Sequence, residues 1–286
     1  MKIPVYVASA FSKDKKGGNK AGVVFIEDSY ALSIPQKMAI AKQLGYAETA
    51  FISESKIADY KLEFFTPKEE VDLCGHATIG SFAILLHFNK LSRTHYTMET
   101  NSGVLTITIK EDILFMEQNK PAFYETISKN SFSECMDIES IDDKYPIQIV
   151  STGLKDILIP IKNVAQIEAL QPNFEKIKEI SQHYDVVGMH LYTLGDNRIT
   201  TRNFAPLYDI NEEAATGTSN GALACYLYKH RYLQQESYVF EQGYALNSPS
   251  EILVKLSITA EKEIEKVYVG GRGYYCETKY LNIDSI

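Results

Sequence analysis

The stretch FTPKEEVDLCGHAT (Phe65–Thr78) decides the fold, because FAPLYDINEEAATGTS (Phe204–Ser219) repeats its plan half a chain later. Each stretch starts with an aromatic residue two positions before a proline and ends in a glycine loop that leads into an apolar segment. Self-similarity at a fixed spacing indicates a duplicated structural unit. Because interfaces between packed domains often hold small ligands, we expect the chemistry of this chain at its two loops.

Composition narrows the class of protein. The 286 residues carry a formal charge of −8, with 45% hydrophobic and 23% charged residues, which is typical of a globular protein with a sizeable core. This charge argues against nucleic acid or an anionic membrane surface as partner, and we expect no membrane span. The four cysteines, which form no CxxC pair, argue against a structural metal site and against a disulfide scaffold. We therefore expect a cytoplasmic protein without a metal, and we interpret the first residues as a strand rather than as a signal peptide.

Alternating apolar and polar residues predict many strands, and four segments are typical of helices. Two helices are amphipathic: one runs from the cap Ser33 to the stop at Gly45, and the other starts at Asn173. Two more helices are apolar around most of their circumference, which is typical of buried helices. They are predicted at residues 76–89 and 219–231.

This pattern predicts an α+β protein with two pseudo-symmetric domains, each a mostly antiparallel, barrel-like sheet around one apolar helix. We expect the domains at residues 1–120 and 121–273, with 274–286 as a candidate last strand of the first domain. The polar segment 121–143 is interpreted as the crossover between them. We interpret 270–273, a Gly-Gly-Arg-Gly run, as a hairpin turn, because no helix follows it.

The two glycine loops are candidate anion sites. A helix that begins at small residues leaves its first amides without intrahelical partners, and the helix dipole also favours an anion there. Gly75 and Gly217, with Asp72 and Thr218 beside them, are therefore predicted to bind a carboxylate. Capping by Thr and Ser is the alternative for a single loop.

Three side chains are candidates for proton transfer. His76 starts the first apolar helix, where it could contact a substrate oxygen or hold a proton. Glu48 lies in the turn before an apolar strand, where partial burial would raise its pKa. Glu213 precedes the second loop, although such a carboxylate can simply cap a helix. For Arg202 we expect a structural ion pair with a nearby acid.

Together these motifs resemble the phenazine-biosynthesis PhzF-like family, which shares its duplicated fold with diaminopimelate epimerase. The resemblance covers nearly the whole chain. It extends from 18–23 (GNKAGV) through 47–51, 72–80 and 151–154 to 202–221.

The resemblance implies an isomerase of the kind that acts on dihydro-3-hydroxyanthranilate, without a cofactor and as a homodimer in a biosynthetic pathway. It implies Glu48 as the acid/base, His76 as the loop histidine and Gly75 as the glycine before it. The second loop departs from the family pattern at Glu213, Ala214 and Thr218, where Asp, Pro and Ser are usual. These departures reshape the expected pocket and make the phenazine precursor doubtful as the substrate.

Two other functions stay open. One is a two-base racemase or epimerase of an amino or hydroxy acid, in which Glu48 is opposed by Glu213 or a loop hydroxyl. A two-thiol epimerase is disfavoured, because Cys74 precedes the loop glycine and Cys225 lies inside the second helix. The other is a non-catalytic ligand-binding member of the fold, which would be favoured if Glu48 and His76 lay too far apart to touch one ligand.

Overall fold

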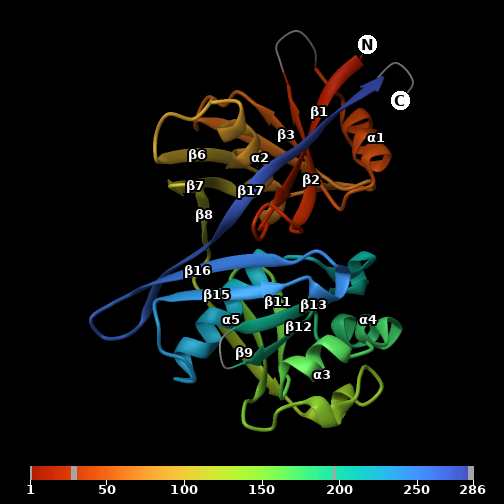
Figure 1. Cartoon of the computed structure of the whole chain (residues 1–286), viewed down its shortest axis with the longest axis vertical. Coiled ribbons are helices and arrows are strands. Elements are labelled where there is room, and N and C mark those ends of the chain that lie inside the picture. Colours follow the sequence, from red (N-terminus) through yellow and green to blue (C-terminus); the bar gives the residue numbers. More distant parts are fainter. Residues whose placement is uncertain (1, 27–30, 196–197, 283–286) are drawn as a thin grey trace. The chain divides into compact units, whose positions relative to one another are not determined.

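A computed structural model divides the chain into two units and describes residues 2–26, 31–195 and 198–282 (Figure 1). Unit 1 comprises Met1–Glu117 and Gly270–Ile286, and unit 2 comprises Gln118–Val269. The part of the expected last strand at 283–286 lies outside the described residues. None of the helices in the described ranges combines the length and apolar character needed to cross a bilayer.

Unit 1 is a closed sheet that curves around helix α2 (Gly75–His87) (Figure 1). Neighbouring strands pair in the order β8–β17–β1–β2–β3–β4–β6–β7–β8, which returns to its start. The strands are β1 (Lys2–Ala10), β2 (Asn19–Phe25), β3 (Thr49–Ser53), β4 (Tyr60–Phe65), β5 (Glu70–Val71), β6 (His95–Thr100), β7 (Gly103–Lys110), β8 (Ile113–Gln118) and the C-terminal part of β17 (Ile264–Asn282).

Unit 2 contains its own sheet and the buried helix α5 (Gly217–Lys229). Its strands are β9 (Ala122–Ile127), β10 (Ile147–Ser151), β11 (Lys155–Pro160), β12 (Gly188–Leu194), β13 (Ile199–Ala205), β14 (Ile210–Glu213), β15 (Ser237–Gln242), β16 (Ser250–Ile258) and the start of β17. Its other helices are α3 (Val164–Ala169) and α4 (Phe174–His183), and it also holds the short 3-10 turns η1 (Lys129–Phe132), η2 (Ile138–Ser140), η3 (Pro206–Tyr208) and η4 (Tyr244–Leu246).

The two units share one sequence of strand pairings. In unit 1 antiparallel and parallel pairs alternate. The pairs β1–β2, β3–β4 and β6–β7 are antiparallel, and the pairs β2–β3 and β4–β6 between them are parallel. In unit 2 the pairs β10–β11, β11–β12, β12–β13, β13–β15 and β15–β16 follow the same sequence. The molecule is therefore a mixed α/β protein with barrel-like sheets and few helices.

Each central helix is buried because it is apolar around most of its circumference. Within α2, every residue from His76 to Leu85 is buried, and within α5 every residue from Ser219 to Leu227 is buried. Burial of this much apolar surface at about 25 cal/mol per Å² is the main stabilising contribution of such a helix. Because both helices are buried and rigid, they hold the predicted site residues at their first turns in fixed positions.

A smaller apolar layer lies under each crossover helix. In unit 1, α1 (Ile34–Leu44) covers β3 and β4 with Ile40, Ala41 and Leu44, which pack with Phe51 and Phe65. The helix begins where Gln36 accepts a hydrogen bond from the Ser33 amide, and it ends at Gly45 in the left-handed conformation (φ +72°). In unit 2, helix α4 likewise packs against the sheet through apolar residues, namely Phe174, Ile177 and Ile180.

Two local predictions are wrong. Residues 121–143, expected as a polar crossover, contain strand β9, which pairs with β10 and completes the edge of unit 2. The Gly270–Gly273 run is no hairpin turn, because β17 passes straight through it. A Cβ atom at Gly273 would lie 2.7 Å from the Cβ atom of Ala83, and one at Gly270 would lie 2.5 Å from the Leu114 carbonyl oxygen. These glycines therefore allow close packing inside a strand.

Candidate active site

Glu48 occupies the short connection between helix α1 and strand β3. Gly45 ends the helix and β3 begins at Thr49, so the backbone fixes where the Glu48 side chain leaves the chain. The side chain is only 14% exposed, and its Oε2 atom is buried. A carboxylate in such a place needs a charged or hydrogen-bonding partner.

His76 is that partner, in the first turn of α2. Its Nε2 atom lies 3.1 Å from the Oε2 atom of Glu48, and its side chain is 7% exposed. The helix begins at Gly75 with Cys74 as an extended N-cap residue, and the first intrahelical bond runs from the Thr78 amide to the Cys74 carbonyl, at 3.0 Å. The amides of Gly75, His76 and Ala77 therefore stand at the positive end of the helix dipole.

Cys74 joins the pair as a third group. Its Sγ atom lies 3.5 Å from the Nδ1 atom of His76, and the donor atoms of Glu48, Cys74 and His76 all lie within 4.8 Å of one another. Figure 1 shows α2, which carries His76 and directly follows Cys74, inside the sheet of unit 1. The result is a compact, buried cluster of a carboxyl, a thiol and an imidazole.

Glu48 and His76 shift each other's pKa in the direction that favours their charged forms. Burial by itself would lower the pKa of His76, but its interactions with Cys74 and Glu48 outweigh burial and hold the pKa well above 6.5. Burial raises the pKa of the Cys74 thiol, so near neutral pH Glu48 is the charge that acts on His76. For Glu48, burial favours the neutral acid, but the charge and hydrogen bond of His76 prevail and lower its pKa. We therefore describe the resting pair as carboxylate and imidazolium.

Two kinds of chemistry suit such a cluster. Carboxylate, thiolate and imidazole are donors that Zn²⁺ accepts, so Glu48, Cys74 and His76 are the described residues that could hold a metal ion. A metal requires the imidazole without its proton, whereas the ion pair keeps His76 protonated.

The second predicted loop, in unit 2, starts helix α5. Glu213 ends strand β14 and its Oε2 atom accepts a hydrogen bond of 2.8 Å from the Thr216 hydroxyl. Gly217 is the first, buried residue of the helix, and the carbonyl of half-buried Thr218 accepts a hydrogen bond from the Thr152 hydroxyl at 3.1 Å. As in α2, the side chain of the N-cap residue, here Thr216, makes no capping hydrogen bond to its helix.

Arg202 has the predicted structural role. Its guanidinium makes two hydrogen bonds of 2.8 Å to the carboxylate of Glu212, and both side chains are buried. The remaining Nη1 donor reaches the carbonyls of Ile167 and Leu170. The predicted ion pair is confirmed, and Glu212 is thereby fully engaged.

The structure brings some predicted site residues together and separates others. Glu48, Gly75 and His76 form one cluster in unit 1, whereas Asp72 lies exposed in the bend before Cys74. Glu213, Gly217 and Thr218 form the corresponding group in unit 2. Cys74 was missed as a site residue. The sequence places it directly before the loop glycine, which was a usable signal, but spacing alone does not tell where an N-cap side chain points.

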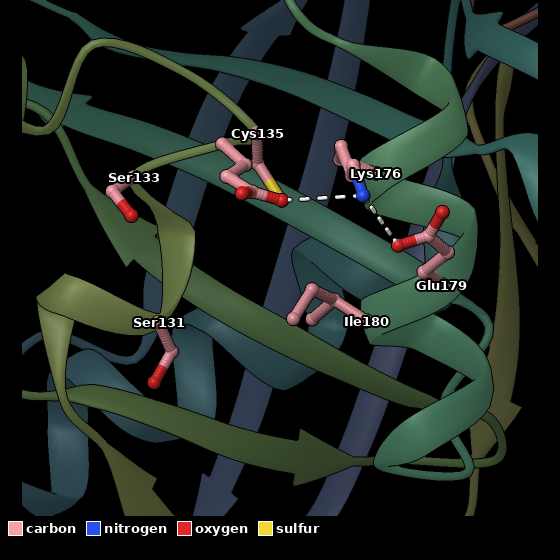
Figure 2. Close-up of a pocket in the computed structure, with 7 residues that line it drawn as sticks. Ser131, Ser133, Cys135, Lys176, Glu179 and Ile180 are labelled. Carbon is pink, nitrogen blue, oxygen red and sulfur yellow. Dashed lines mark hydrogen bonds and ion pairs between the residues drawn. The ribbon is translucent and has the colours of Figure 1, made fainter.

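A separate hollow of about 160 Å³ lies in unit 2 between η1 and α4 (Figure 2). The Nζ atom of Lys176 lies 3.2 Å from the Glu134 carboxylate and 2.9 Å from that of Glu179, so the positive charge of this lysine is already paired. Its volume is below the 300–1,000 Å³ that is usual for ligand pockets. The lining residues are Ser131, Ser133, Glu134, Cys135, Lys176, Glu179 and Ile180. We assign this hollow no function.

Comparison with known proteins identifies the family to which the chain belongs. The family model for phenazine biosynthesis-like proteins, PhzC-PhzF, matches residues 8–279. An uncharacterized isomerase of Clostridium acetobutylicum is 33% identical over 92% of this chain and 93% of its own length, and the uncharacterized isomerase YddE of Escherichia coli K12 is 30% identical over 95% of both.

Solved structures agree with this. A PhzF-family phenazine biosynthesis protein from Bacillus anthracis is 26% identical, with a TM-score of 0.89 over 99% of both chains. A hydroxyproline epimerase from Agrobacterium vitis, 12% identical with a TM-score of 0.64 over 98% of this chain and 92% of its own, shares the fold. The chain belongs to the PhzC-PhzF family of phenazine biosynthesis-like proteins, and with its relatives it is an enzyme of the isomerase and epimerase class.

Proposed function

We propose that this protein is a cofactor-independent isomerase that moves a proton within a small, unsaturated carboxylic acid, with Glu48 as the acid/base. The observation that carries the proposal is the contact of 3.1 Å between Glu48 and His76, beside the first amides of α2. A spacing too wide for one ligand would have favoured a non-catalytic member of the fold. The observed spacing allows both groups to touch one substrate.

The proton transfer follows from the electrostatics of the pair. In the resting enzyme His76 lowers the pKa of Glu48 and makes it a weak base. When a substrate oxygen takes over the hydrogen bond of His76, burial dominates at Glu48 and raises its pKa, so the carboxylate becomes a stronger base. Glu48 then accepts the proton as the substrate C–H bond breaks, and the electron pair passes into the conjugated system. Return of that proton to another carbon of the substrate restores the Glu48 carboxylate.

The start of α2 would bind the acid group of the substrate. The amides of Gly75, His76 and Ala77 provide donors, and the helix dipole favours the charge that develops in the transition state. In the proposal Glu213 assists protonation, and the amides of Gly217 and Thr218 contribute to binding. Glu213 and Thr218 are larger than the family's usual Asp and Ser, and Ala214 lacks the ring of the usual proline, so we expect a substrate other than the phenazine precursor.

A substrate screen tests the proposal. Small carboxylic acids are ranked by the thermal shift they cause, and proton NMR in heavy water then follows each binder with enzyme added. We expect a double bond to migrate with much of the substrate hydrogen retained, because one buried group carries the proton. Binding of many acids without migration or exchange in any of them would contradict an isomerase.

The contact between Cys74 and His76 supports a second candidate, a two-base epimerase in which the Cys74 thiol is one base and a group on the opposite face of the substrate carbon is the other. Such an enzyme would invert a stereocentre with uptake of one solvent deuterium. A two-thiol version lacks support, since burial in α5 raises the pKa of Cys225 to about 12.

We also infer that the two units arose by duplication and that the enzyme acts as a homodimer. The shared sequence of strand pairings supports the duplication. Family membership alone suggests the dimer and the cytoplasmic, biosynthetic setting. Sedimentation equilibrium tests the dimer, and a monomer at micromolar concentration would contradict it.

A further inference from the structure

A continuous run of side-chain hydrogen bonds crosses the interior of unit 2 and ends at Glu213. It links strands β12, β13 and β15 with the start of α5. Three of its members, His190, Asn220 and Gln242, are 0% exposed, and Thr216 is half-buried. Side chains in such a place must satisfy one another, so the direction of each hydrogen bond can be worked out from the partners.

The carboxamide of Gln242 has a single acceptable orientation. Its Oε1 atom accepts hydrogen bonds from the Thr216 amide at 3.2 Å and from the Asn220 amide group at 2.9 Å. Its Nε2 atom donates to the Glu213 carbonyl at 2.9 Å and to the Thr216 hydroxyl at 3.1 Å. Reversal of the group would set donors against donors. Because the Thr216 oxygen accepts from Gln242, its own hydrogen points to the Glu213 carboxylate, 2.8 Å away.

The same reasoning fixes the state of His190. The Asn220 amide group donates to the Thr216 carbonyl at 2.8 Å and to Gln242, so the Asn220 carbonyl accepts from the Nε2 atom of His190 at 3.2 Å. The Nδ1 atom of His190 in turn accepts from Asn203 at 3.3 Å. A neutral imidazole with its hydrogen on Nε2 satisfies both partners. Burial lowers the pKa of His190 to about 3, so this state persists across the neutral range.

We propose that this one-way chain of donors, with Gln242 at its centre, is a positioning device that holds the Glu213 carboxylate ionised and in one orientation. The chain runs Asn203, His190, Asn220, Gln242, Thr216, Glu213. Each member donates one hydrogen bond to the next, and the carboxylate is the final acceptor. The catalytic importance of the device rests on the role of Glu213 in the proposed function.

An ordinary buried polar network would stabilise the fold without acting on Glu213. The two roles differ in one measurable property. A hydroxyl that donates to an ionised carboxylate lowers the pKa of that carboxyl, whereas a network that merely fills the interior leaves the pKa unchanged. The decisive measurement is therefore the titration of Glu213 itself.

The experiment titrates glutamate that is ¹³C-labelled at the side-chain carboxyl, in the full-length protein, with the Glu213 signal assigned from its loss in Glu213→Gln. Thr216→Val removes the hydroxyl and keeps the shape of the side chain. We expect the pKa of Glu213 to rise by about one unit, a tenfold change in its acid constant, as for the loss of one hydrogen bond to a charged group. Thr216→Ser, which keeps the hydroxyl, should restore the original value.

Thr193→Val is the matched control, because its buried hydroxyl has no hydrogen-bond partner among the described residues and the valine should leave the titration unchanged. If Thr216→Val does not fold, Thr216→Ala makes the same test. An unaltered pKa of Glu213 in the folded variant overturns the positioning device. If the pKa shifts as expected while Glu213→Gln retains full turnover, the device stands and the role of Glu213 in the proposed function fails.

Discussion

The Nε2 atom of His76 lies 3.1 Å from the Oε2 atom of Glu48, with both side chains largely shielded from solvent. Each group changes the pKa of the other in the direction that stabilises the charges. The contact joins the turn after α1 to the first turn of α2, two places that are 28 residues apart in the chain (76 − 48 = 28). It is thus both a link within unit 1 and the centre of the proposed chemistry.

Substitution of Glu48 tests the acid/base. Glu48→Gln keeps the shape of the side chain and removes its ability to accept a proton, so we expect turnover to fall about 10²- to 10⁴-fold. Binding of the substrate, measured by thermal shift, should change little. Glu54→Gln, at an exposed position six residues on, is the matched control. Full turnover in Glu48→Gln would show that another group moves the proton.

Substitution of Cys74 separates isomerase from epimerase. If Glu48 carries the proton, Cys74→Ser should keep at least about a tenth of the turnover, because serine preserves a small polar N-cap side chain. If the thiol is a base, its loss should cost on the order of a hundredfold or more. Kinetics of the variant in heavy water decide between these outcomes. Cys225→Ala, inside α5, controls for the removal of a buried thiol elsewhere.

The stability contributed by the Glu48–His76 pair should depend on pH in a defined way. The raised pKa of His76 stabilises the fold fully below its ordinary value of 6.5, and this stabilisation is lost as the pH rises through the higher folded value. The lowered pKa of Glu48 stabilises the fold above its ordinary value of 4.5, and this stabilisation is lost as the pH falls through the lower folded value. The pair therefore contributes most between these two ordinary values.

His76→Gln tests this dependence. Urea unfolding should show a loss of about 3 kcal/mol near pH 5.5, as for a buried pair that loses one partner, and a smaller loss near pH 10. His95→Gln, at an exposed histidine of the same unit, should show neither effect. An equal loss at every pH would mean that His76 contributes by packing rather than by charge.

Asp156 should make unit 2 less stable as the pH rises. Burial raises its pKa to about 7, with the charge of Glu213 adding to the effect and hydrogen bonds from Ser219 and Asn203 opposing it. Between the ordinary value of 3.8 and about 7, the unfolded chain releases a proton that the folded chain retains, so stability falls with pH and then levels off.

Asp156→Asn should remove most of this slope. It keeps an acceptor for the Ser219 hydroxyl, 2.7 Å away, and it should raise the free energy of unfolding at pH 8 by about 2–4 kcal/mol. Urea midpoints at pH 5 and pH 8 measure the difference. Asp143→Asn, at an exposed aspartate of unit 2, is the control. A variant with the slope of the parent protein would contradict a raised pKa.

Much of this fold could be predicted from sequence because its signals are local. Alternating apolar residues predicted the principal strands, and Ser33 and Gly45 marked the ends of α1. The apolar segments after Gly75 and Gly217 predicted the two buried helices. Strand β9 was missed because its residues Phe123, Tyr124 and Glu125 are partly exposed on an edge, where the apolar alternation is weak.

The site was harder to predict than the fold. The loop pattern led to Glu48 and His76, but their contact depends on how the turn after α1 packs beside α2. Cys74 and the donor chain from Asn203 to Glu213 depend on side-chain directions that spacing does not reveal. Gly270 and Gly273 were misread for a related reason, since a glycine needed for close packing resembles one needed for a turn.

The pairing of β1 with β17 has a consequence for biosynthesis. Lys2 lies opposite Asn282, and Ala10 lies opposite Gly273. During translation β1 of unit 1 therefore has one edge without its partner strand until the segment after Gly273 has left the ribosome. Over that interval the unpaired backbone groups of β1 can pair with strands of other chains, so this edge is exposed to aggregation until β17 covers it.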